Sequence, residues 1–113
     1  MIINNVDLID IDIFDADTAE KYEDALKEVE AVTETVKDMK LSDSVKAQCN
    51  SIFKVFNILF GEGTDKKVFG DKVNLLVCIK AFGELVEQVN KQKSAMEEIA
   101  DKYSPNRAQR RKK

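Results

Sequence analysis

The sequence has no histidine, and only one proline and four glycines among its 113 residues. Without histidine the chain lacks the usual general base and the commonest metal ligand, which excludes any Ser/His/Asp or Cys/His catalytic set. The serines and lysines show no activating arrangement, so we expect neither an enzyme nor a cofactor. The scarcity of glycine and proline argues against a β-sandwich or barrel, which needs many turns.

Cysteine is also scarce, since only Cys49 and Cys78 are present. Both lie within apolar stretches, which predicts buried free thiols in a reducing compartment, although a disulfide between them stays open. The first residues, MIINNVDLIDID, lack the basic region and continuous apolar core of a signal peptide. No uncharged apolar run approaches the ~18 residues that span a bilayer. We therefore expect a soluble intracellular protein without a membrane partner.

Apolar residues (43%) and charged residues (35%) are abundant. A chain of this length makes one domain, and high charge with regularly spaced apolar residues is typical of helices with solvated outer faces. The charge is uneven, because residues 104–113 hold five basic residues and no acidic one. Since the whole chain has a net charge of −3, residues 1–103 carry −8.

Hydrophobic periodicity predicts an all-α fold for residues 1–104: a three-helix, possibly four-segment, bundle behind an extended N-terminal segment. The predicted elements are an extended segment at 6–14 and helices at about 17–40, 44–60 and 71–103. The expected helix caps are Asp15 or Asp17, Ser42 or Asp43, and Asp71.

Residues Ile9, Ile11 and Ile13 alternate with aspartates, which is typical of a half-buried strand. One strand cannot make a sheet. It must pair with another chain, form a hairpin with residues 1–5, or lie extended across the helices, and the sequence leaves these three possibilities open.

The last helix follows a period of about 3.5 residues and would be ~48 Å long if unbroken from residue 72 to residue 103. The helix before it is shorter, so either the last turns project beyond the bundle or the helix bends near Gly83 or Asn90. The residues that set this period are Leu75, Ile79, Phe82, Val86, Val89, Met96 and Tyr103.

The stretch FNILFGEGTDKKVFG (56–70) places glycines and lysines after an apolar run. It is not a phosphate loop, because neither Gly61 nor Gly63 has a glycine five positions later and the preceding segment is helical. We expect a mechanical role: Gly61 stops a helix, and Val68 and Phe69 fold back as an apolar plug.

An acidic cluster at residues 10–17 invites a metal interpretation. Both possible EF-hand frames fail, because Asp15 or Asp17 stands where the loop requires glycine. Solubility and helix capping explain these aspartates, so we expect no metal site.

The basic tail, residues 105–113, has no interleaved aromatic residues and follows an acidic body, which argues against nucleic acid. A solvated tail and an acidic protein partner both stay open. Its basic residues are Arg107, Arg110, Arg111, Lys112 and Lys113.

Three stretches, DIDIFDADTAEKYEDAL (10–26), FNILFGEGTDKKVFG (56–70) and NRAQRRKK (106–113), resemble tail assembly chaperone-like proteins. These are small helical proteins of long-tailed, siphovirus-type phages and prophages of Gram-positive bacteria. The similarity spans nearly the whole chain, and its most specific part runs from Phe60 to Thr64 and continues at Phe69-Gly70.

The resemblance implies a non-enzymatic protein of the host cytoplasm that binds the tape measure protein during tail assembly. An apolar surplus on residues 45–60 would suit a helical client and would also favour a homo-oligomer. The candidate contact residues, which could equally be core, are Phe53, Phe56, Phe60 and Phe69. The alternatives are a self-assembling particle subunit that pairs through residues 9–13, and a nucleic-acid adaptor that uses the basic tail.

Overall fold

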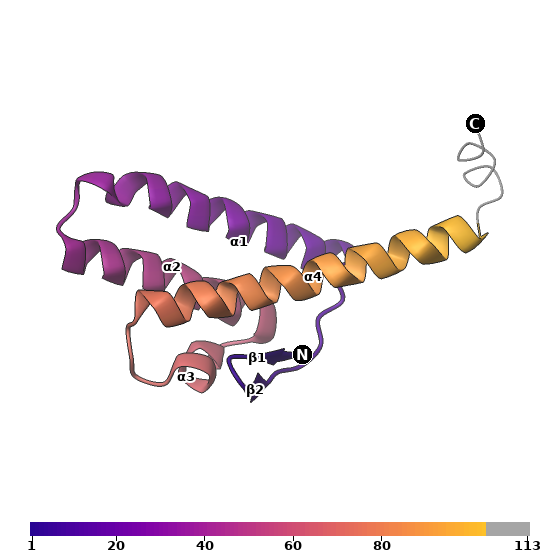
Figure 1. Ribbon diagram of the computed structural model, residues 1–113, viewed down its shortest axis with the longest axis horizontal. Helices are drawn as coiled ribbons and strands as arrows, with labels where there is room; N and C mark the ends of the chain where they lie inside the picture. Colours follow the sequence, from indigo (N-terminus) through magenta and orange to yellow (C-terminus); the bar gives the residue numbers. More distant parts are fainter. Residues whose placement is uncertain (104–113) are drawn as a thin grey trace.

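The computed structural model describes residues 1–103 and confirms the all-α fold with a short extended N-terminus (Figure 1). Residues 104–113, with the basic tail, lie outside the described part. The elements in order are β1 (Ile2–Ile3), β2 (Val6–Asp7), α1 (Ala16–Thr35), the 3₁₀ turn η1 (Val36–Asp38), α2 (Leu41–Phe60), α3 (Thr64–Phe69) and α4 (Leu75–Tyr103).

Helices α1 and α2 form an antiparallel hairpin (Figure 1). Of the two predicted caps, Asp15 is the one that caps α1, because its Oδ2 accepts a hydrogen bond from the backbone N–H of Thr18 at 3.2 Å. The expected cap of α2 is wrong: Lys40 is the N-cap and makes no side-chain hydrogen bond. The helix begins before Ser42 and Asp43, so both lie in its first turn, where the acid favours the helix dipole.

The glycine-rich connection contains a helix that the sequence did not reveal. Gly61 ends α2 with φ of +109°, and Gly63 precedes the six-residue α3 with φ of +88°. These left-handed conformations are accessible to glycine at little cost. Helix α3 carries Val68 and Phe69 into the core, which confirms that this segment is an apolar plug.

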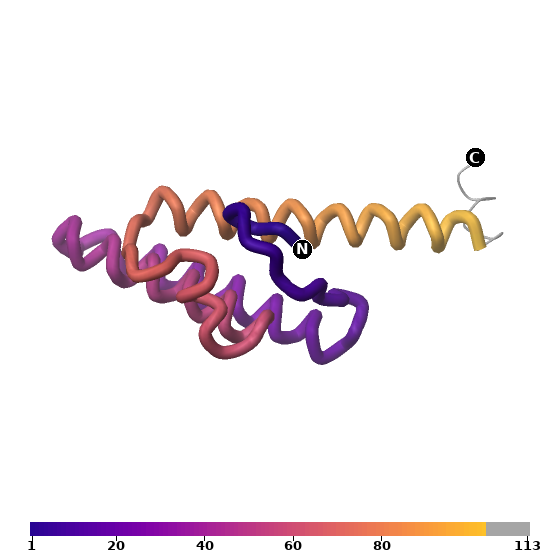
Figure 2. The backbone as a smooth tube through the Cα atoms, turned by 90° about the horizontal axis from the view of Figure 1, so that it is seen from below, coloured from indigo at the N-terminus to yellow at the C-terminus, as the bar shows by residue number. Residues whose placement is uncertain are grey.

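Helix α4 begins at Leu75, later than predicted. Asn74, and not Asp71, caps it, because the Oδ1 of Asn74 accepts from the N–H of Val77 at 3.1 Å. Asp71 instead lies 3.5 Å from the Nζ of Lys66. The helix runs unbroken for 29 residues, about 43 Å, and its last turns project past the other elements (Figures 1 and 2).

The buried stripe of α4 consists of Cys78, Ala81, Leu85 and Val89. The predicted stripe was rotated from this one, since Ile79 is 51% exposed in the structure. The inner face mixes the small Cys78 and Ala81 with the larger Leu85 and Val89, and it packs on α2, whose Cys49 is also fully buried.

The N-terminus forms the hairpin that the sequence left as one of three possibilities. Strands β1 and β2 pair antiparallel, with Ile3 opposite Val6. Asn4 and Asn5 connect them, both with positive φ, as a two-residue type I′ turn requires. Beyond the hairpin, residues 8–13 cross the helices and bury Ile11 and Ile13, whereas Ile9 is 66% exposed.

Candidate partner-binding surfaces

An aromatic cluster joins α2 to α3. The ring of Phe69 lies 5.0 Å from that of Phe53 and meets the ring of Phe56 edge-on at 5.4 Å. Phe60 stacks on Phe56 at 5.9 Å. Phe56 is fully buried and Phe69 is 8% exposed, so these two rings hold α3 against α2 and offer a partner almost no surface. Phe53 and Phe60 are half-buried, and their contact with a partner stays a prediction.

The projecting end of α4 carries a different apolar surface. Phe82 and Val89 pack in or against the core, and the same face recurs every seven residues at Met96 and Tyr103, with Ile99 between them. Beyond the body this face has no cover within residues 1–103. The three side chains, which we call the projecting seam, are Met96 (39% exposed), Ile99 (51%) and Tyr103 (74%).

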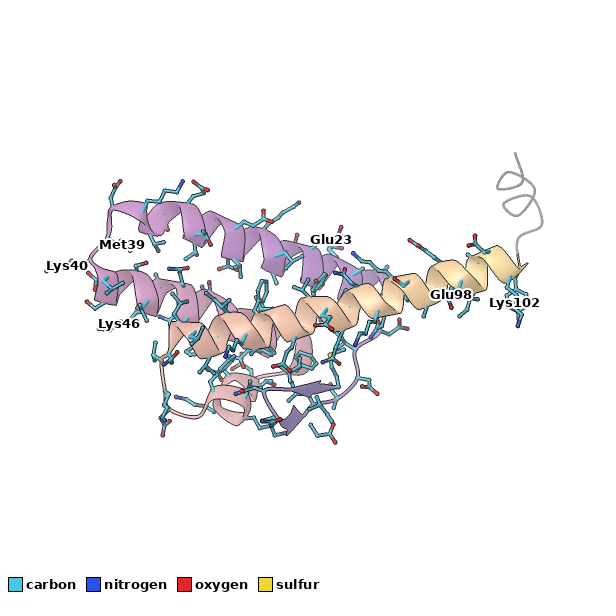
Figure 3. All side chains as sticks on the ribbon, in the orientation of Figure 1. Glu23, Met39, Lys40, Lys46, Glu98 and Lys102 are labelled. Carbon is cyan, nitrogen blue, oxygen red and sulfur yellow. The ribbon has the colours of Figure 1, made fainter. Side chains whose placement is uncertain are left out.

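Around the projecting seam, basic residues lie beside the apolar stripe and acidic residues lie away from it. In the heptad that the seam defines, Lys93 and Lys102 occupy positions flanking the apolar stripe, with alanines at the other flanking positions. Glu97 and Glu98 occupy positions away from it, and Figure 3 shows Glu98 and Lys102 on the projecting turns. The flanks of the seam are therefore positive, and they complement a helix with acidic flanks.

The N-terminal segment is held to α4 by polar side chains one turn apart. The amide nitrogen of Gln92 donates to the carbonyl of Ile11 at 2.9 Å, and that of Gln88 donates to the carbonyl of Ile2 at 2.7 Å. One turn earlier, the carboxylate of Glu84 accepts from the N–H of Asn4 at 3.3 Å. Of these three bonds, the one to Ile11 lies within residues 9–13, and Ile9 stays 66% exposed, so the self-assembling subunit that pairs through residues 9–13 stays a prediction.

A shallow groove separates the hairpin from α4, and its charged groups pair with one another. The α-amino group of Met1 lies 2.6 Å from Asp10 and also donates to the carbonyl of Leu8 at 2.8 Å. Glu87 and Lys91 form an ion pair at 3.6 Å on the α4 side. With its charges paired in this way, the groove does not present the convergent polar groups of a small-molecule site.

Cys49 and Cys78 are free and fully buried in the contact between α2 and α4. Burial raises the pKa of Cys78 to about 12, and a hydrogen bond with Cys49 adds to the shift. A thiol protonated so firmly is a poor nucleophile and a poor metal ligand. Among residues 1–103, no group of three or more His, Cys, Asp or Glu side chains could hold a metal ion.

The remaining site prediction, the basic residues Arg107, Arg110, Arg111, Lys112 and Lys113, lies outside the described residues. Within the described helices, none combines the length and the apolar character needed to cross a membrane.

A sequence profile described as a family of unknown function, DUF6673, matches residues 4–113. No curated protein and no solved structure matches the chain.

Proposed function

The chain belongs to the DUF6673 family, whose function is unknown, and we propose that it is a phage tail assembly chaperone-like protein. In this role it binds the tape measure protein in the cytoplasm of a bacterial host and catalyses no reaction. Two observations support the proposal. Residues 10–26, 56–70 and 106–113 resemble tail assembly chaperone-like proteins, and α4 carries an exposed apolar surface.

The projecting seam is the observation that carries the proposal. It continues a heptad stripe whose earlier residues are buried or packed against the core, so its apolar side chains are spaced to pack against another helix. Met96, Ile99 and Tyr103 together cover only about two turns, which is too little surface for a stable interface between two copies of the seam. A long helical client, which can contact the seam and the body of the domain together, is a better occupant.

Charge supports the same kind of client. Lys93 and Lys102 flank the seam, and five more basic residues follow within residues 104–113. An amphipathic client helix with acidic residues beside its apolar stripe would match both features. The acidic remainder of the chain would keep the complex in solution.

Co-expression with the tape measure protein encoded in the same genome tests the proposal. We expect the tape measure protein to become soluble and to co-purify with the chain. Ile99→Glu, which places a charge in the seam, should abolish co-purification. Leu41→Glu is the matched control, because Leu41 is 82% exposed and begins α2 beside Lys40, at the end of the molecule away from Lys102 (Figure 3). A tape measure protein that stays insoluble with the wild-type chain would refute the proposal.

A further inference from the structure

Helix α4 has a second apolar face, on the side opposite its buried stripe. The other helices all lie to one side of α4, and no other helix of residues 1–103 lies on its opposite side (Figure 2). Away from the buried stripe, Leu76 is 63% exposed, Ile79 is 51% exposed and Val86 is half-buried. We call the set the outer stripe; with alternating spacings of three and four residues it comprises Leu76, Ile79, Gly83, Val86 and Asn90.

Gly83 lies at the centre of the outer stripe, and the fold of the single chain gives no reason for it. A glycine inside a helix costs about 1 kcal/mol relative to alanine. Its φ is not positive, and beyond its own helical turn no atom of residues 1–103 lies within 4 Å of the position that a Cβ would take. A bare backbone on an exposed apolar face allows a second helix to approach closely, at an interaxial distance near 8 Å.

We propose that a second copy of this chain docks on the outer stripe, with the two α4 helices antiparallel and a two-fold axis passing beside Gly83. In this arrangement the stripe is self-complementary, as a two-fold interface requires. Ile79 lies beside Val86 of the second copy, and Leu76 lies beside its Asn90. This contact is separate from the projecting seam and does not depend on the proposed function.

Charge selects the antiparallel direction. Lys80 and Glu87 occupy equivalent flanking positions one heptad apart, so the two-fold axis at Gly83 brings each one beside the other across the interface. In a parallel pair the same positions would face Leu75 and Phe82, which carry no charge. Within one chain Glu87 contacts Lys91 at 3.6 Å, but both side chains are largely exposed, so this pair is weak and can be rearranged.

Exchanging the charges at Lys80 and Glu87 tests the proposal. Sedimentation equilibrium of the full chain over a wide concentration range measures the affinity of the dimer. The wild type should form a dimer, and Lys80→Glu or Glu87→Lys alone should weaken it about tenfold, because each change replaces two attractive contacts by two repulsive ones. The double variant K80E/E87K should recover the wild-type affinity. Lys46→Glu, on an exposed part of α2, should have no effect.

Disulfide trapping gives an independent readout at the axis. In Gly83→Cys two thiols would meet across the two-fold axis, and mild oxidation with oxidised glutathione should link two chains covalently. Asn50→Cys, exposed on α2, is the matched control and should stay monomeric, because the native cysteines are buried. A wild-type chain that is monomeric at all concentrations would overturn the proposal. So would a dimer in which K80E/E87K fails to restore what the single changes remove.

Discussion

Gln92 and Ile11 are joined by a 2.9 Å hydrogen bond, in which the side-chain amide of α4 donates to the backbone carbonyl of the N-terminal segment. The Oε1 of the same glutamine accepts from the N–H of Ile13 at 3.4 Å. One polar side chain on a buried stripe therefore replaces the neighbouring strand that residues 11–13 would otherwise need.

Gln92→Ala should destabilise the domain by about 1–2 kcal/mol, because it leaves partly buried backbone groups at Ile11 and Ile13 without partners. Urea unfolding followed by circular dichroism measures this change. Lys93→Ala, at the adjacent exposed position, should change the free energy of unfolding by less than about 0.5 kcal/mol. Equal stability of the Gln92 variant and the wild type would mean that the segment is held by Ile11 and Ile13 packing alone.

Phe69→Ala should cost about 3–5 kcal/mol, because it removes the ring that fills the space between Phe53 and Phe56. Phe69→Leu keeps most of the volume and should cost less than about 1.5 kcal/mol, so it stays measurable if the alanine variant does not fold. Ile58→Ala, at a 44% exposed position of α2, is the control and should have a small effect. A small loss in both Phe69 variants would contradict the role of α3 as a plug.

The cysteines predict a pH dependence on the alkaline side. Burial raises the pKa of Cys78 to about 12, so the folded state keeps a proton that the unfolded chain releases near pH 8.5. The contribution of the Cys78 thiol to the free energy of unfolding is therefore fully present below about pH 8.5, and it is lost as the pH rises toward 12.

Urea unfolding of the wild type and of Cys78→Ala between about pH 7.5 and pH 10 measures this contribution. The wild type should lose stability more steeply than the variant, by up to about 1.4 kcal/mol per pH unit. Both thiols should also resist a thiol reagent until urea unfolds the chain. Rapid labelling of native protein, or identical pH profiles, would contradict the burial of this pair.

The sequence was sufficient to predict the long helices, whose apolar residues recur over many turns. It predicted α1, α2 and α4, because each rests on apolar residues repeated over several turns. It narrowed the first cap only to Asp15 or Asp17, and it left open whether the last turns project or the helix bends. It could not decide which of two adjacent faces of α4 is buried. Ile79 is more apolar than Ala81, yet close packing against α2 selects the smaller residue for the inner face.

The other differences between the predictions and the structure arise where the local sequence allows more than one solution. Asp71 and Asn74 are equally good caps by residue type, and only the fold shows that Asn74 accepts from Val77. Six residues of α3 are too few to show a period. The phenylalanines could equally be core or partner surface in the sequence, and contacts between segments distant along the chain decided that Phe56 and Phe69 are core.

Hydrogen exchange of the α4 backbone, with and without the tape measure protein, tests most directly whether another polypeptide covers the projecting seam. In the free chain the amides of residues 96–103 should exchange quickly, because Met96, Ile99 and Tyr103 are exposed. On binding they should slow by about tenfold or more, while those of Ile52 to Phe56 in the buried centre of α2 should change little. Unchanged exchange at residues 96–103 in a complex that protects other residues would contradict the account.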